Sequence, residues 1–369
     1  MAVSSPSRAE ARFKQICCLG LGGEALIPAL LNELHVIVPY YCARVFLIDE
    51  GGRITNSYDE HPESHLSAGV YWQEFHGRPG RELAGTFPDI IRTQIGVRDF
   101  EETLGALKIE LNAFYRSDFY NVIYRATQVD LFMRLIVRER GRGRPLGVIT
   151  MHRAIGDDRW TAEEKRRLGS LEPFLAHAMA AHGPCDEPLA NSGSDGLIVS
   201  DRAGKLISFS PQGGQLLFLA THERVAPGAA LGRSTVLPPP LVKLCRDLTR
   251  IFTDDPTTAA PTFHHRNVWG GFQFRAHWLN GSDPDSGLIG ITVNHKEPLT
   301  VRLIRRVGEL PLTRRQAQAC LLMARGVSYD KIAEQLGISK HTAIAHGRGI
   351  YNKLDVHNRA ELVSELLSN

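Results

Sequence analysis

Apolar residues recur at every third or fourth position in the last part of the chain, between Leu312 and Leu367. This spacing places them on one face of each of four short helices, and a helix with one apolar face packs against its neighbours. Three residues with N-capping side chains precede helical segments, and two glycines follow segments where a left-handed residue ends a helix. These residues are Thr313, Ser328, Ser339, Gly326 and Gly337. The pattern predicts a compact bundle that contains a helix-turn-helix.

The third helix of this bundle is expected to run from Ser339 to about Leu354, and it has two different faces. Small and apolar residues form the face that we expect to be buried: Ala343, Gly347, Ile350 and Leu354. The opposite face carries the side chains that we expect to enter a DNA major groove: Lys340, His341, Ile344, Ala345, Arg348 and Asn352. Arg or Lys can bind guanine, Asn can pair with adenine, and an apolar side chain can contact a thymine methyl group.

The two ends of the third helix are suited to phosphate. Ser339 and Thr342 supply hydroxyl groups at the helix start, where backbone amides also point outward. Lys353 and Arg359 are expected to add phosphate contacts at the far end. The spacing alone is equally consistent with a small helical bundle whose basic face is only solvated.

The same segment resembles the DNA-binding domain of the LuxR family of bacterial transcription regulators. The matching residues are Leu312, Thr313, Arg315, Gly326, Ile332, Ala333, Leu336, Ile338, Ser339, Thr342, His346, Ile350, Tyr351, Lys353, Leu354, Asn358, Arg359, Ala360 and Leu362. The resemblance implies a homodimer that forms through the fourth helix, from Asn358 to Leu367. Leu362, Val363, Leu366 and Leu367 supply the apolar face of that helix.

Two departures from the family pattern are visible. Gln316 stands where the family usually has Glu, which is expected to remove an internal ion pair. Ala343 and Ile344 stand where the family usually has Val and Lys, so one basic contact on the groove face is missing. We expect these differences to affect DNA affinity and site preference more than the fold.

The first domain is expected to span residues 8–183. Its pattern predicts a long helix over 8–38 that breaks near Gly20 to Gly23, hairpin strands over 43–48 and 53–58, and a helix over 101–119. Strands over 131–138 and 146–153 follow, and then a closing helix over 162–181 that Thr161 caps. This order predicts an antiparallel sheet with helices on one side.

The order of elements in the first domain resembles a GAF domain, and such domains usually hold a small molecule. The local match covers 145–149 and 160–164. Six aromatic residues are candidates for a pocket lining, although packing in the core is the more common role for such residues: Tyr71, Trp72, Phe75, Tyr115, Phe119 and Tyr120. The sequence does not identify a ligand. It lacks the second strand and acceptor Asp of a phosphoacceptor domain, and it lacks the Trp, Tyr and Asp pattern of acyl-homoserine-lactone receptors.

Turn-forming residues over 183–193 predict a linker, and a middle domain is expected over 194–298. Strands over 195–201 and 206–210, helices over 211–220 and 241–252, and a meander from 262 to 294 resemble a PAS domain. Such domains bind ligands or pair with each other. Four histidines lie on these strands, but alternation places the adjacent pair, His264 and His265, on opposite faces, so no metal site is predicted.

Residues 299–310 connect the middle domain to the bundle, which is expected over 311–369. Leu299, Leu303, Ile304 and Val307 make one apolar edge, and three arginines lie opposite. The pattern is consistent with a signalling helix that pairs across a dimer, and equally with a plain linker.

Charge separates the two parts of the chain. From Leu299 onward there are eleven Lys and Arg against six Asp and Glu, whereas residues 1–298 hold 32 against 34. The basic residues are therefore concentrated in the part that is expected to meet a polyanion. The six cysteines are scattered, without a metal or redox spacing, and no apolar run is long enough for a membrane span or signal peptide. We expect a cytoplasmic protein with reduced thiols.

No nucleophile motif, phosphate-binding loop or metal-ligand set is present in the sequence, so neither an enzyme nor a cofactor is predicted. The expected fold class is multidomain α+β, with two antiparallel-sheet sensory domains followed by an all-α helix-turn-helix domain. The expected function is a dimeric transcription regulator that binds double-stranded DNA, takes a small-molecule ligand in its N-terminal domains and contacts RNA polymerase if it is an activator. The alternative is a signalling module whose helical tail pairs with a partner protein.

Overall fold

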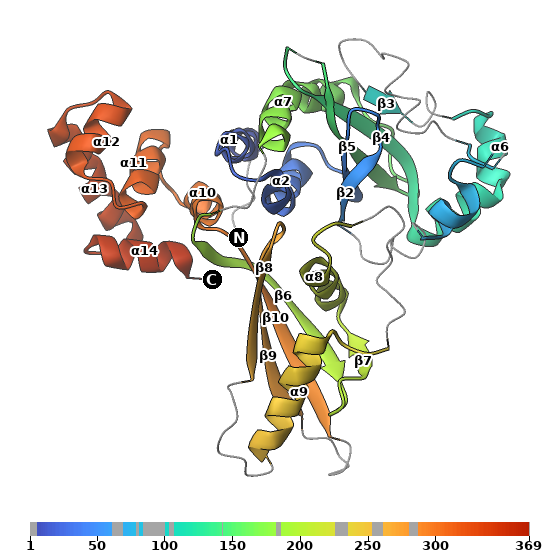
Figure 1. Cartoon of the computed structure of the whole chain (residues 1–369). Coiled ribbons are helices and arrows are strands. Elements are labelled where there is room, and N and C mark those ends of the chain that lie inside the picture. Colours follow the sequence, from blue (N-terminus) through green and yellow to red (C-terminus); the bar gives the residue numbers. More distant parts are fainter. Residues whose placement is uncertain are drawn as a thin grey trace.

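The chain folds into two five-stranded antiparallel sheets and a C-terminal group of helices, as a computed structural model shows (Figure 1). The structure describes residues 6–60, 69–78, 81–83, 100–102, 107–141, 143–181, 186–225, 235–252, 261–279 and 287–368. This architecture is the mixed α+β class that the sequence predicts. None of the helices in these ranges combines the length and the apolar character needed to cross a membrane.

The first sheet has the strand order β2-β1-β5-β4-β3. Its strands are β1 (Cys42–Ile48), β2 (Ile54–Asp59), β3 (Phe100–Glu102), β4 (Val129–Arg138) and β5 (Pro145–Ala154). The central strand β5 lies between β1 and β4, with Val45 and Leu135 on either side of Ile149. Eight successive residues of β5, from Pro145 to His152, are buried, which requires that both faces of the sheet are covered.

Three helices cover one face of the first sheet: α1 (Pro6–Cys17), α2 (Gly23–Ile37) and α7 (Ala162–Ala180). The break between α1 and α2 falls where the glycines predict it, and Gly20 has a positive φ of 69°. Thr161 caps α7 through a reciprocal capping box with Glu164. These features of the first domain are confirmed.

The prediction of helices on only one side of this sheet is wrong. The other face is covered by α6 (Leu111–Arg116), the short π-helices η1 (Tyr71–Phe75) and η2 (Tyr120–Tyr124), and the 3₁₀ turn η3 (Arg125–Thr127). The expected helix over 101–119 is also wrong at its start, because β3 pairs there with β4. Residues 103–106 of that stretch lie outside the described residues.

The second sheet has the order β7-β6-β10-β9-β8, which is the order of the first sheet repeated. Its strands are β6 (Leu189–Ser200), β7 (Leu206–Phe209), β8 (Thr262–Asn267), β9 (Gly270–Leu279) and β10 (Leu288–Pro298). Helices α8 (Pro211–Thr221) and α9 (Pro239–Phe252) pack on it. Strand β6 begins inside the stretch predicted to be a linker, because residues 189–191 pair with the end of β10.

The two sheets belong to one continuous core rather than to separate ones. Gln215 of α8 donates hydrogen bonds to Tyr58 Oη (3.2 Å) and to the carbonyl oxygen of Asp59 (2.8 Å) in β2. Asn56, which is also buried on β2, accepts a hydrogen bond from the amide of Val225 (2.9 Å). Polar contacts between sheets at buried positions fix their relative placement.

Five helices follow the second sheet (Figure 1). The first is α10 (Leu299–Glu309), and the C-terminal bundle consists of α11 (Arg314–Ala324), α12 (Tyr329–Leu336), α13 (Lys340–Leu354) and α14 (Arg359–Leu367). Nearly all of the segment 299–310 forms the helix α10, and the apolar residues of α10 are buried within this chain. A signalling role and a plain linking role for this helix both stay predictions. Val301 and Ile304 belong to the core of the sheets, whereas Leu303 and Val307 belong to the core of the bundle.

Candidate nucleic-acid interface

The helix ends of the bundle are fixed by the caps that the sequence predicts. Thr313 accepts a hydrogen bond from the amide of Gln316, and the Gln316 side chain accepts one from the amide of Thr313. Ser328 and Ser339 cap α12 and α13. Gly337 takes the left-handed conformation between these two helices, with φ at 63°. These local signals create a helix-turn-helix in α12 and α13.

The inner face of α13 is built from small residues, which let the helix approach α12 closely. Ala343, Gly347 and Ile350 are buried, and Leu354 is half-buried. A Cβ atom at Gly347 would overlap the ring of Tyr329 on α12. Glycine is therefore required at this position by packing, not by a turn.

The outer face of α13 presents its polar side chains to solvent. Exposed positions on this face are Lys340, His341, Ala345, Arg348 and Asn352, and Ile344 is half-buried. All the residues predicted to enter a groove thus lie on one side of one helix, opposite the buried stripe. This is the arrangement that groove reading requires, since the side chains must reach the base edges together.

The start of α13 is organised by hydroxyl groups. Ser339 Oγ accepts a hydrogen bond from the amide of Thr342 (3.0 Å) and lies 2.8 Å from Thr342 Oγ1. Lys340 Nζ forms an ion pair with Asp330 Oδ1 of α12 (2.9 Å), and both side chains are exposed. An exposed ion pair of this kind is weak, so the amine remains accessible to a stronger anion such as phosphate.

The far end of α13 is tied to the rest of the bundle. Lys353 Nζ donates to the carbonyl oxygen of Pro311 (3.0 Å) and to Gln316 Oε1 (2.9 Å). Gln316 therefore preserves, as a hydrogen bond from the Lys353 ammonium group to a neutral amide oxygen, a contact that Glu would make as an ion pair. Arg359 donates to the carbonyl oxygen of Val327 (2.8 Å) and is half-buried. In this structure Arg359 joins two segments of the bundle rather than projecting toward a phosphate.

The apolar face of α14 is largely occupied within the chain. Leu362 and Leu366, two of the four residues expected at a dimer interface, are fully buried in the bundle core, where α14 packs against α10 and α11. Val363 and Leu367 are half-buried. The expectation that Leu362 and Leu366 face a second copy is wrong, because the chain itself covers them.

The geometry defines a helix-turn-helix bundle with an exposed reading face on its third helix. Residues 310–366 match the family described as "Bacterial regulatory proteins, luxR family". The C-terminal bundle is therefore a LuxR-family helix-turn-helix domain. A curated relative, the Fimbriae Z protein of Salmonella typhimurium (strain LT2), is 38% identical over 55 residues. Those residues are 15% of this chain and 26% of that protein, so the chain matches about a quarter of the relative's length.

Solved structures give weaker similarities over longer stretches. A phage VqmA–DPO complex is 20% identical, with a TM-score of 0.19, and the match covers 47% of this chain and 81% of that chain. SdiA in complex with octanoyl-rac-glycerol is 11% identical, with a TM-score of 0.25, over 97% of this chain and 86% of that chain. The family assignment rests on the C-terminal match and not on these structures.

The aromatic residues predicted near a ligand pocket form a cluster under the first sheet. Phe75 and Phe119 line a hollow of about 350 Å³, together with Val70, Leu83, Val122, Glu74, Arg81, Ser117 and Asp118. The other members of the predicted set contact one another edge-on, Tyr71 with Trp72 at 5.2 Å and Tyr115 with Tyr120 at 4.8 Å. Packing is therefore the main role of these rings in the structure.

Two buried histidines differ in character: sequence reasoning missed His152, whereas His295 is one of the four strand histidines for which no metal site is predicted. His152 of β5 has an Nδ1 atom without a hydrogen-bond partner among the described residues, and burial holds the pKa of His152 well below its ordinary value, with Arg44 and Arg134 adding to the effect. His295 of β10 lies 2.9 Å from the carbonyl oxygen of Trp269 and 3.0 Å from Ser192 Oγ. Burial lowers the pKa of His295 as well. The strand pattern gave no signal for the environment of His152.

Proposed function

We propose that this protein is a transcription regulator that binds promoter DNA as a dimer through α13. The observation that carries the proposal is the division of α13 into a buried stripe and an exposed face with Lys340, Arg348 and Asn352. Ser339, His341, Thr342, Ile344, Ala345 and Lys353 complete the proposed DNA-contacting set. The LuxR-family match over residues 310–366 supports the same function.

We propose further that the two sheets are sensory modules, GAF-like and PAS-like, that control DNA binding. Their shared strand order and the hollow beside Phe75 and Phe119 support a ligand-responsive role for the first sheet. An activator of this kind would also contact RNA polymerase. The domains are proposed to span 8–183 and, because β6 begins at Leu189, 189–298, with the bundle over 311–369.

The test begins with sequencing of DNA fragments that the purified full-length protein selects from a random library. Binding to a selected fragment should weaken steeply with salt, because each phosphate contact releases counterions. Arg348→Ala should relax the preference for one base pair and weaken binding by about 1–3 kcal/mol. Arg325→Ala, which removes an exposed arginine at the end of α11, serves as the matched control. A salt-independent interaction, or no selection of DNA, would favour a protein partner for the helical tail instead.

A further inference from the structure

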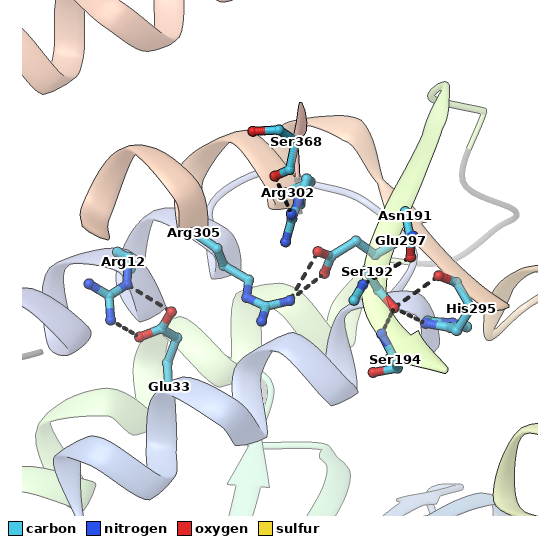
Figure 2. Close-up of polar contacts among 11 residues, drawn as sticks. Arg12, Glu33, Asn191, Ser192, Ser194, His295, Glu297, Arg302, Arg305 and Ser368 are labelled. Atoms are coloured by element: carbon cyan, nitrogen blue, oxygen red, sulfur yellow. Dashed lines mark hydrogen bonds and ion pairs between the residues drawn. The ribbon is translucent and has the colours of Figure 1, made fainter. Parts of the chain in front are cut away.

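Helix α10 packs against α1 of the first domain, and two charged pairs lie at this junction, as Figure 2 shows. Arg12 of α1 binds Glu33 of α2 in a two-pronged ion pair, with Nε–Oε1 at 2.8 Å and Nη2–Oε2 at 2.6 Å. Arg305 of α10 binds both carboxylate oxygens of Glu297 at the end of β10, at 3.0 and 3.1 Å. Arg12, Glu33 and Glu297 are buried, with exposed fractions of 8%, 4% and 3%.

The position of Arg12 depends on the absence of a side chain in α10. A Cβ atom at Gly308 would overlap the Cδ and Nη1 atoms of Arg12. Arg12 cannot move aside cheaply, because its guanidinium group is held by Glu33, and breaking a buried ion pair is costly. We call Arg12, Glu33, Glu297, Arg305 and Gly308 the junction cluster.

The start of α10 is held by the segment between the two sheets. Glu187 accepts hydrogen bonds from Thr300 Oγ1 (2.8 Å) and from the Thr300 amide (3.3 Å). The other side of α10 is attached to α14, since Arg306 pairs with Glu365 (3.4 Å) and Arg302 donates to the carbonyl oxygen of Ser368 (3.2 Å). Helix α10 is thus bonded to both the sheets and the bundle, and it is buried in both cores.

We propose that the junction cluster is a lock that holds the bundle in one orientation on the first domain, and that DNA is bound by the unlocked form. In the proposed unlocked form the bundle takes another orientation, in which two copies fit two half-sites of a duplex. The contacts of the junction cluster are lost in that movement, so they reduce the fraction of molecules that is competent to bind. A ligand that shifts α1 or α2 would release α10 by disturbing Arg12.

The lock is tested without DNA by measuring a distance between spin labels in the full-length protein. The labels are placed at exposed sites on α7 and α12, through Arg166→Cys and Glu334→Cys, after Cys18→Ser and Cys185→Ser. The parent should give one narrow distance distribution, and Gly308→Ala should give a broad one. Gly349→Ala is the matched control, because it adds the same methyl group to a helix but faces Gln316 within the bundle.

Thr300→Val is a second variant, milder than Gly308→Ala. It removes the side-chain hydrogen bond to Glu187, and it should also broaden the distance distribution. A distribution that is already broad in the parent would overturn the lock. So would one that stays narrow in both Gly308→Ala and Thr300→Val.

The second measurement rests on the proposed function, because it uses a DNA fragment that the full-length protein selects. Gly308→Ala should bind that fragment about tenfold more tightly than the parent. The substitution changes no charge, so a gain is not a general electrostatic effect. Unchanged or weaker binding would overturn the regulatory part of the proposal. Failure to select any DNA would contradict the proposed function, while the spin-label distances would still decide whether the lock exists.

Discussion

Gln316 shows how one side chain can serve two helices at once. Its amide oxygen accepts a hydrogen bond from the Thr313 amide (3.1 Å) and another from Lys353 Nζ (2.9 Å). The first contact caps α11 and the second connects α11 to the end of α13. A carboxylate at this position would strengthen both, because it would turn the contact with the Lys353 ammonium group into an ion pair and because an acidic group favours a helix start.

Gln316→Glu is therefore expected to raise the free energy of unfolding of the bundle by about 0.5–1 kcal/mol. The measurement is urea denaturation of the full-length protein, followed by hydrogen exchange of the α11 amides. When Lys353→Met is added, the part of the gain that comes from the contact with Lys353 should disappear. The part that comes from an acidic group at the start of α11 should remain. A loss of stability in Gln316→Glu would show that the interaction with Lys353 is absent in solution.

Two buried histidines predict how stability depends on pH. The pKa values of His152 and His295 are lowered by burial, so below about pH 6.5 the unfolded chain binds more protons than the folded chain. Stability should fall as the pH drops from 7.5 to 5.5, by up to about 1.4 kcal/mol per pH unit for each histidine. Chemical denaturation across this range measures the slope. His152→Leu should reduce the slope, and an equal slope in that variant would rule out His152 as its source.

At the scale of elements, the stability of the bundle depends on the close packing of α13 against α12. Gly347→Ala should destabilise the bundle by about 1–3 kcal/mol, because the added methyl group overlaps Tyr329 in a packed core. Gly349→Ala is the control on the same helix. Its Cβ would lie 3.0 Å from Gln316 Nε2, a looser approach than the one to Tyr329 at Gly347, and Ala has the better helix propensity, so the loss of stability should be much smaller. Thermal unfolding of the two variants checks the contrast, and similar melting temperatures would refute it.

The elements of the bundle could be predicted closely from sequence because their signals are local. Thr313, Ser328 and Ser339 cap the helices that they precede, and Gly326 and Gly337 have positive φ. The role of α10 could not be predicted in the same way. Its apolar edge shows that Leu303 and Ile304 are buried, but no local pattern shows that they belong to different cores.

The architecture of the first domain could also be predicted only in part from local sequence patterns. Apolar runs and glycine-rich turns located the strands β1, β4 and β5, yet the second face of their sheet is covered by short helices whose rings gave no periodic signal. The proposed groove residues were found because they share one face of a helix, and residues three or four positions apart in a helix lie on the same face. The partners of Lys353 and Arg359 are distant in sequence, and they became visible only in the structure.

On the scale of the whole molecule, the shared core implies that the two sheets unfold together. Asn56 connects them, since its side chain donates to the carbonyl oxygen of Glu223 (3.2 Å) and accepts from the amide of Val225 (2.9 Å). Asn56→Ala would leave the buried Val225 amide without this partner, so the free energy of unfolding should fall by about 1–3 kcal/mol.

Calorimetry and hydrogen exchange of β5 and β10 check this prediction. A single transition that moves to lower temperature, with equal loss of protection in both strands, is the expected result. Two transitions, of which only one moves, would show that the sheets are independent. Thr55→Ala, an exposed change on the same strand β2, should leave the transition in place.

The bond between Lys353 and the carbonyl oxygen of Pro311 has a consequence for the whole chain. Pro311 lies just after α10. Because Lys353 of α13 is bonded to Pro311, a duplex that tilts α13 would also displace the segment next to the junction cluster. Coupling between two binding events is reciprocal: if an effector of the first domain favours DNA binding, DNA must favour that effector by the same factor. The promoter itself would then adjust the effector concentration at which the protein responds.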